Sequence, residues 1–443
     1  MIYLFLKRVV KWSFLILFRR KVISGENNIP SSGPLIIAVN HPNTLIDPLL
    51  VASQIKRKVG FLANASIFIN KLIKYIFNYF WVIPVYRKKD VKPGEKQDNS
   101  KSFQKCYEFF DREGALLIFP EGTSVHELKL RDIKKGTAWI ALGYESERNF
   151  EGNLEINTVA INYSDPIKFR SMASVVINPS FKVSDYKALW EQDQELAVQK
   201  LTDRIRYEME DQITITKNKE QEQTVLLAQK FYAEYIDPSL SRYSDPLRSF
   251  DLRKKLAEKV IAVQDEDPVL FKENAKALQL YFFDLNRLKL SPGILRARFL
   301  NRNKAWILFL YVLELSFLIP FYFIGLATNY LPYKIPDWLF RLLNPEIEYR
   351  ASIMMLAGMI LFPVFYVVDV ILFREFISNE LIWTLFFIVS LPFLGFLTLF
   401  YWKIINRFFR ILHFYFRIGA SEKKRLLEQQ TKLILLFQKL MVK

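Results

Sequence analysis

The chain has 443 residues, of which 51% are hydrophobic and 15% aromatic, so it can hold two or three domains and membrane segments besides. Its 62 lysines and arginines exceed its 45 aspartates and glutamates. Long apolar stretches accompany this excess, and nucleic-acid-binding motifs do not. The expected partner is therefore anionic membrane lipid and not nucleic acid. A single cysteine, Cys106, excludes an internal disulfide, and only three histidines argue against a multi-histidine metal site.

Residues 1–24 predict an amphipathic helix that lies in a membrane interface. Lys7, Arg8 and Lys11 fall on one face, among leucine, phenylalanine, tryptophan and valine. Three cations in the middle of the segment argue against a transmembrane span, and no small-residue cleavage site of a signal peptide follows. The alternative is a buried first helix of the next domain.

Residues 25–182 alternate between short apolar runs and helical patterns, which is typical of an α/β domain with a mixed, largely parallel sheet. The predicted strands are Leu35–Val39, Val59–Leu62, Trp81–Tyr86, Ala115–Phe119, Asn157–Tyr163 and Ser174–Ile177. The predicted helices between them are Leu49–Lys56, Ile67–Tyr79, Lys101–Arg112 and Asp132–Tyr144.

Polar clusters follow three of these predicted strands. Asn40 and His41 come after the first, Arg87–Lys89 after the third, and Pro120–Ser124 after the fourth. Ligands of open α/β sheets bind beyond the carboxyl ends of the strands. The three clusters therefore predict one shared crevice.

His41 is the expected general base of this crevice, and Asp47 is its expected orienting partner. An imidazole has an ordinary pKa of about 6.5 and can take a proton from a hydroxyl at neutral pH. A carboxylate beside it fixes the tautomer and steadies the imidazolium. Asp47 and Pro48 also resemble an N-cap and a first helical residue, so the alternative for Asp47 is a helix cap alone.

The remainder of the chain divides by composition into three regions. Residues 183–300 are rich in Lys, Glu, Gln and Leu, which predicts a helical accessory region. Residues 301–403 predict a transmembrane region of two to three spans, and residues 404–443 predict a basic amphipathic tail. The accessory helices are expected at Tyr186–Ile213, Glu220–Tyr235, Ser249–Val263 and Pro268–Lys289, and the spans at Ala305–Ala327, Ile353–Phe373 and Leu381–Trp402. The tail is expected to lie on the membrane or to pack on the α/β domain.

The sequence alone leaves the number of true membrane spans open. Arg302 and Lys304 precede the first apolar segment, and Lys403, Arg407 and Arg410 follow the last, so the positive-inside rule puts both flanks in the cytoplasm. Three spans put the flanks on opposite sides. Either one segment is re-entrant, or the positive-inside rule does not hold for one of the two flanks.

The stretch from Gly25 to about Phe181 resembles the catalytic domain of glycerolipid acyltransferases. The resemblance rests on an ordered set of motifs: His41 with Asp47, Ile83–Arg87, Phe119–Ser124, Lys134–Ala138 and Val159–Tyr163. The usual pattern of that family has four residues between His and Asp, whereas five separate them here. Neither spacing places two side chains on one helix face, so the pair must bridge a loop. The longer spacing resembles the branch of fungal-type glycerol-phosphate and dihydroxyacetone-phosphate acyltransferases.

This resemblance implies a membrane enzyme, with its catalytic domain on the cytoplasmic face, that moves a fatty acyl group to a hydroxyl of glycerol-3-phosphate or 1-acyl-glycerol-3-phosphate. The donor is a thioester, acyl-CoA or acyl-carrier-protein, which is a co-substrate, and no cofactor or metal is implied. The resemblance also implies substrate-binding residues. Asn40 is expected to hold the loop or to bind the oxyanion, and Arg87 and Lys134 to bind the phosphate. Glu121, Gly122 and Thr123 are expected to bind the acceptor.

Two other functions compete with this expectation. The first keeps the thioester chemistry but acylates a non-phosphorylated lyso-aminolipid, and would not depend on Arg87. The second is a non-catalytic membrane scaffold, which would not depend on His41.

Overall fold

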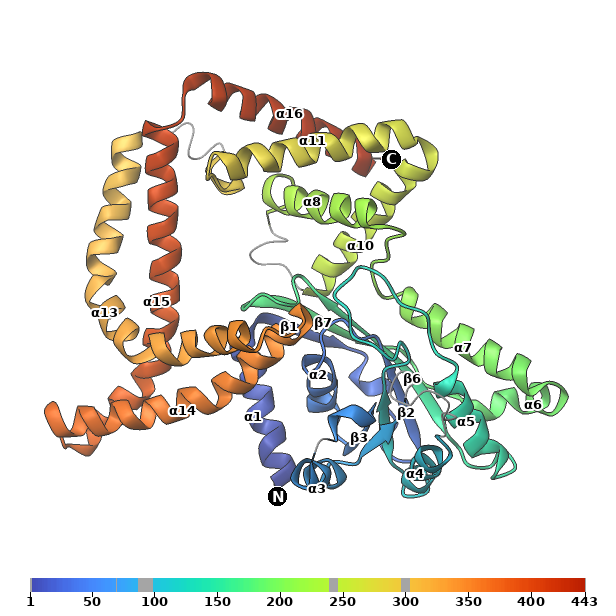
Figure 1. The fold of residues 1–443 in the computed structure, drawn as a ribbon. Coiled ribbons are helices and arrows are strands. Elements are labelled where there is room, and N and C mark those ends of the chain that lie inside the picture. The colour runs from blue at the N-terminus through green and yellow to red at the C-terminus, as the bar shows by residue number, and fades with distance from the viewer. Residues whose placement is uncertain (1, 69, 87–98, 239–245, 296–302, 443) are drawn as a thin grey trace. The chain divides into compact units, whose positions relative to one another are not determined.

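The computed structural model of the protein describes residues 2–68, 70–86, 99–238, 246–295 and 303–442 (Figure 1). The chain forms two compact units. The sheet unit comprises Met1–Ile215, Asp245–Phe250 and Glu346–Ser352, and the helical unit comprises Thr216–Ser244, Asp251–Pro345 and Ile353–Lys443.

The sheet unit is built on one eight-stranded sheet, in which β2 is central to the order β1-β7-β6-β2-β5-β3-β4 and β8 pairs with β6. Its strands are β1 (Phe18–Ser24), β2 (Leu35–Val39), β3 (Val59–Asn64), β4 (Val82–Val85), β5 (Ala115–Ile118), β6 (Glu155–Tyr163), β7 (Ser171–Ile177) and β8 (Phe181–Lys182). The pairs of β6 with β7 and with β8 are antiparallel and the other pairs are parallel. The predicted mixed, largely parallel sheet is confirmed.

Helices alternate with these strands along the chain. The α-helices of the sheet unit are α1 (Ile2–Leu17), α2 (Ile46–Gln54), α3 (Lys71–Tyr79), α4 (Ser100–Phe110), α5 (Gly136–Ser146), α6 (Lys187–Gln192) and α7 (Gln194–Glu210). Short 3-10 helices form at η1 (Glu26–Asn28), η2 (Ala65–Ile67), η4 (Val183–Tyr186) and η6 (Ile347–Tyr349).

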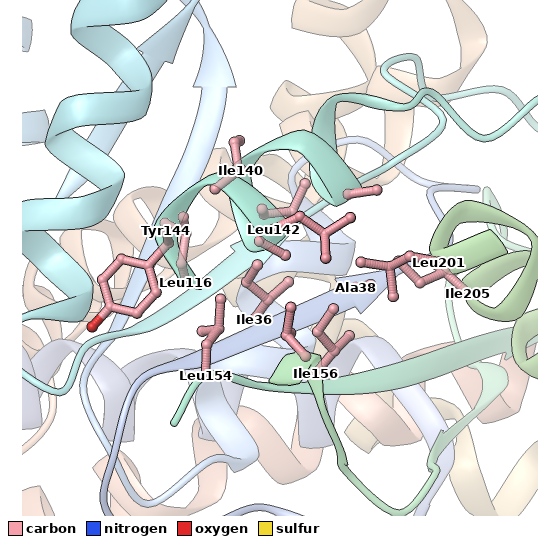
Figure 2. Close-up of a cluster of buried hydrophobic side chains, with 14 of the residues drawn as sticks. Ile36, Ala38, Leu116, Ile140, Leu142, Tyr144, Leu154, Ile156, Leu201 and Ile205 are labelled. Carbon is pink, nitrogen blue, oxygen red and sulfur yellow. The ribbon is translucent and has the colours of Figure 1, made fainter. Parts of the chain in front are cut away.

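The core lies against the middle of the sheet, where all five residues of β2 are buried. A strand covered on both faces is apolar throughout, which explains the uninterrupted run Leu35–Val39. Figure 2 shows the side chains that fill one of these faces. They are Ile36 and Ala38 of β2, Leu116 of β5, Ile156 of β6, Ile140 and Leu142 of α5, and Leu201 and Ile205 of α7. This packing fixes the carboxyl end of β2, from which Asn40 and His41 emerge.

The prediction of a single helix over residues 1–24 is wrong beyond Leu17. The chain turns there into β1, which pairs parallel with β7. Arg19, Arg20 and Lys21 lie on this edge strand, and charged residues are common on sheet edges because they discourage pairing with a second chain. The partner strand lies about 150 residues further along the chain, so no local pattern indicates it.

Two other predicted helices have different bounds because neighbouring polar groups intervene. The helix predicted over Asp132–Tyr144 begins only at Gly136, since Lys134 N–H donates to the carbonyl of Pro120 at 2.8 Å and holds the preceding residues as a loop. The helix predicted over Tyr186–Ile213 is broken into α6 and α7. Asp193 divides them and caps α7 by accepting from Leu196 N–H at 3.0 Å.

The helical unit contains the accessory helices, the apolar helices and the tail. Its helices are α8 (Lys219–Tyr235), α10 (Pro246–Glu266, whose first residues belong to the sheet unit), α11 (Pro268–Arg287), η5 (Pro292–Leu295), α13 (Lys304–Leu343), α14 (Arg350–Phe376), α15 (Leu381–Phe416) and α16 (Ala420–Val442). Within the described chain, three helices are long and apolar enough to cross a membrane: Lys304–Leu343, Ile347–Phe376 and Leu381–Phe416.

Helix α13 is longer than the predicted segment Ala305–Ala327 and contains Pro320, Pro332 and Pro336. Its first part pairs with α15, where the Tyr322 and Tyr401 rings stack with centroids 4.3 Å apart. Figure 1 shows α13 bending away from α15 after this pairing. Interior prolines are a common cause of such a bend.

The C-terminal helix α16 packs on α8 and α11 within the helical unit. Arg425 donates to Asp284 of α11 at 2.7 Å, and the Phe437 ring stacks on Phe231 of α8. Leu426 and Leu433 are buried by the same contacts.

Candidate active site

The candidate site begins where β2 ends, and Asn40 fixes that point. Its amide nitrogen donates to the carbonyl of Ile161 at 3.0 Å, and its amide oxygen accepts from Ile161 N–H at 2.7 Å. The side chain thus pairs with β6 as a further strand residue would. Of the two roles expected for Asn40, holding the loop is the one that these bonds support.

His41 and Asp47 lie together across the loop between β2 and α2. His41 Nδ1 is 2.9 Å from Asp47 Oδ2, and the imidazole stacks on Phe119 with ring centroids 3.8 Å apart. The side chain of His41 is 16% exposed, whereas that of Asp47 is fully buried. With Asp47 accepting from Nδ1–H, the other ring nitrogen, Nε2, carries the lone pair that a general base needs.

Asp47 is held by three donors, and it is not the cap of α2. Leu45 precedes the helix, and Asp47 is the second helical residue. Besides His41, the carboxylate accepts from Asn43 N–H at 2.6 Å and from the Tyr163 hydroxyl at 2.7 Å. These donors fix the position of the carboxylate, so Asp47 can orient the imidazole of His41.

Tyr163 is a member of this site to which sequence analysis assigned no role, although it ends the motif Val159–Tyr163. It closes β6, and its ring stacks on Phe18 of β1 with centroids 5.7 Å apart. Burial, and then the charge of Asp47, raise the pKa of the Tyr163 hydroxyl well above its ordinary value, so the hydroxyl stays protonated and keeps donating. Its position at the end of a strand beside β2 was the available signal.

Glu121 ties the loop after β5 to the loop after β2. Its two carboxylate oxygens accept from His41 N–H at 2.7 Å and from Arg131 N–H at 3.0 Å. The side chain is 6% exposed, and this burial raises the pKa of Glu121 above its ordinary value while the two N–H donors oppose the rise. Two of the three predicted polar clusters are thus brought together.

Gly122 and Thr123, which follow Glu121 in the cluster Pro120–Ser124, are exposed. Gly122 adopts φ +71°, a left-handed conformation that favours glycine, and it forms the turn with Glu121. Thr123 and Lys134 are exposed, and Lys134 lies beside the turn, since its Cγ is 3.8 Å from the position of a Cβ on Gly122. Arg87, and with it the third cluster Arg87–Lys89, lies outside the described residues.

Comparison with known proteins places a family model over this site. Residues 20–161 match the family model described as Acyltransferase. Glycerol-3-phosphate O-acyltransferase 1 of Saccharomyces cerevisiae is 23% identical over 234 residues, which cover 34% of this chain and 31% of the yeast protein. A chloroplastic 1-acyl-sn-glycerol-3-phosphate acyltransferase of Arabidopsis thaliana is 26% identical over 119 residues, covering 27% of this chain and 32% of the plant protein.

A solved structure was also found, that of the 1-acyl-sn-glycerophosphate acyltransferase PlsC of Thermotoga maritima. It is 18% identical, with a TM-score of 0.33, over 45% of this chain and 77% of that protein. The chain matches about a third of the length of each of the two curated relatives. The family match therefore assigns an acyltransferase domain to residues 20–161 of the chain, the part that holds His41, Asp47 and Glu121.

Proposed function

We propose that the protein is a membrane-bound O-acyltransferase of phospholipid biosynthesis. It moves a fatty acyl group from acyl-CoA or acyl-carrier-protein to a hydroxyl of glycerol-3-phosphate or 1-acylglycerol-3-phosphate. The printed names of the yeast and plant relatives support this class of acceptor. The observation that carries the proposal is the hydrogen bond of 2.9 Å between His41 Nδ1 and Asp47 Oδ2 at the mouth of β2.

In the proposed reaction, His41 activates the acceptor alcohol. Its Nε2 takes the hydroxyl proton while the alcohol oxygen attacks the thioester carbonyl, and Asp47 stabilises the imidazolium that forms. The new C–O bond forms and the C–S bond breaks. The proton on Nε2 then passes to the departing thiolate, so the products are an ester and a free thiol. This balance needs no covalent intermediate on the protein.

The proposed acceptor site lies around the turn at Gly122. Lys134 is an exposed cation beside this turn, and Arg87 follows β4, whose carboxyl end lies on the same edge of the sheet as that of β2. Cations of these types suit a phosphate, arginine through its planar fork and lysine as a point charge. Glu121 supports a different role from the expected one, because both of its oxygens already accept backbone N–H groups. We assign it to holding the His41 loop.

Membrane attachment is the remaining part of the proposal. Three helices of sufficient length and apolarity support it, and so does the exposed apolar surface of α1, which includes Phe5, Trp12 and Leu15. The formal charge of +17 suits anionic lipid headgroups. We place the catalytic domain at the cytoplasmic face, in keeping with the basic flanks of the apolar region.

The proposal is tested with the full chain in detergent or membranes, given each thioester and each acceptor, and with products identified by mass spectrometry. His41→Ala is expected to lower the turnover rate by at least about 100-fold, as the loss of a general base does. His413→Ala, a histidine of α15 in the helical unit, is the matched control and should retain the wild-type rate. A wild-type chain that transfers no acyl group, or a His41→Ala variant of near-normal rate, would contradict the proposal.

The phosphate preference is tested in the same assay. Arg87→Ala is expected to raise the KM for a phosphorylated acceptor and to leave the KM for the thioester unchanged. A lyso-aminolipid without phosphate serves as the competing acceptor. Efficient acylation of that lipid, together with no effect of Arg87→Ala, would show that the acceptor is an aminolipid and not a phosphorylated glycerol.

A further inference from the structure

A segment from far beyond the acyltransferase domain belongs to the sheet unit. Residues Glu346–Ser352, here called the strap, connect α13 to α14 and comprise η6 and the first turn of α14. Within the strap, Ala351 and Ser352 are buried. The strap is more than 180 residues beyond the end of the family match.

The strap is hydrogen-bonded to the loop that joins His41 to Asp47. Thr44, in the middle of that loop, is buried, and its hydroxyl donates to the carbonyl of Glu348 at 3.0 Å. The Ser352 hydroxyl lies 2.9 Å from the same Thr44 oxygen. Because the single proton of Thr44 goes to the carbonyl, Ser352 is the donor of the second bond.

The same segment also contacts the loop that follows Glu121. His126 N–H donates to the Glu348 carboxylate at 3.3 Å. Ser124, two residues earlier, accepts from Thr44 N–H at 2.8 Å. The strap, the His41–Asp47 loop and the Glu121 loop are thus connected to one another by hydrogen bonds.

The loop between His41 and Asp47 needs such support. It contains five residues, so the two side chains do not share a helix face, and their separation depends on the loop conformation. We infer that the strap is a positioning element of the active site, acting through the hydroxyls of Thr44 and Ser352 to hold Asp47 in reach of His41. This inference rests on the proposed function.

The test uses the full chain and four variants: Thr44→Val, Ser352→Ala, the two combined, and Thr44→Ser. Thr44→Val is expected to lower kcat by about tenfold to 100-fold, because small displacements of catalytic groups have effects of this size. The KM for the thioester should change less than the rate. Thr44→Ser keeps the hydroxyl and should restore most of the rate. The double variant should be no slower than Thr44→Val alone, since both changes remove one shared bond.

Thr202→Val is the matched control, because Thr202 is also buried but its hydroxyl donates to Val198 of its own helix. It should retain the wild-type kcat. Equal losses in Thr202→Val and Thr44→Val, or rates within about twofold of wild type in both Thr44→Val and Ser352→Ala, would overturn the inference.

Hydrogen exchange separates this result from a failure of the proposed function. In a wild-type chain without acyl transfer, faster exchange of the amides of residues 43–46 in Ser352→Ala, and not in Thr202→Val, would still support the strap. Unchanged exchange in Ser352→Ala would overturn it.

Discussion

The Tyr163 hydroxyl donates a hydrogen bond to the buried carboxylate of Asp47, and the rate of the reaction is expected to depend on this bond. Because the pKa of Tyr163 is raised, its hydroxyl is not the group that titrates near neutral pH. Removing it leaves Asp47 with two donors in place of three. A carboxylate with fewer donors is held less firmly, so the imidazole that it orients is also held less firmly.

Tyr163→Phe is therefore expected to lower kcat in the acyl-transfer assay by roughly tenfold, the effect of a misplaced orienting group. Phe18→Leu is the control, because it changes the ring that stacks on Tyr163 but keeps the hydroxyl. A wild-type kcat in Tyr163→Phe, or an equal loss of kcat in Phe18→Leu, would contradict a role for the hydroxyl.

Sequence and structure agree best for the residues that carry recognisable chemistry. His41 and Asp47 were predicted because an imidazole and a carboxylate after a buried strand are a known acid–base arrangement. Glu121 was predicted as a residue of the site, but its two backbone partners depend on loops that only the folded chain brings together. Tyr163 was assigned no role, since a tyrosine at the end of a strand has no distinctive pattern.

Among the elements, the turn that carries Glu121 depends on the conformation of one glycine. Gly122→Ala is expected to destabilise the sheet unit by about 1 kcal/mol, because alanine rarely adopts φ +71° although space for its Cβ is open. Gly136→Ala is the control, since Gly136 begins α5 with nothing within 4 Å of its Cβ position. The measurement is the apparent midpoint of thermal unfolding. It should fall for Gly122→Ala alone, and equal midpoints would show that the turn tolerates a side chain.

Elements were predictable where their own residues determine them. β2 was predicted with its observed bounds because a strand buried on both faces is apolar at every position. β1 was not predictable, since it is a strand only through its pairing with β7. The break between α6 and α7 shows that one capping aspartate, Asp193, can divide a long helical pattern.

For the whole molecule, the strap limits how the apolar helices can cross a bilayer. Its bonds to Thr44 place Glu346–Ser352 on the side of the catalytic site. Lys304 at the start of α13 is basic, and the positive-inside rule puts this end of the helix on the cytoplasmic side, where we place the catalytic domain. Both ends of α13 are then expected on the same side of the bilayer.

We therefore expect α13 to be re-entrant and α14 and α15 to cross once each, which puts both basic flanks on one side. Single cysteines at Asn303, Asn344 and Asn379 test this with a membrane-impermeant maleimide. Burial raises the pKa of Cys106 to about 12, so the native thiol should stay unlabelled. Asn303→Cys and Asn344→Cys should label from one side and Asn379→Cys from the other. Labelling of the first two from opposite sides would mean that α13 crosses once.

The position of β1 at the sheet edge bears on how this protein can be shortened for biochemistry. A fragment that begins at Gly25, where the family resemblance begins, would leave one side of β7 without its parallel partner. An exposed row of strand N–H and C=O groups recruits other chains, so we expect such a fragment to aggregate. The fragment would also lack Phe18, whose ring stacks on that of Tyr163. A useful minimal enzyme therefore has to keep β1, Phe18–Ser24, even where the helix before it is removed.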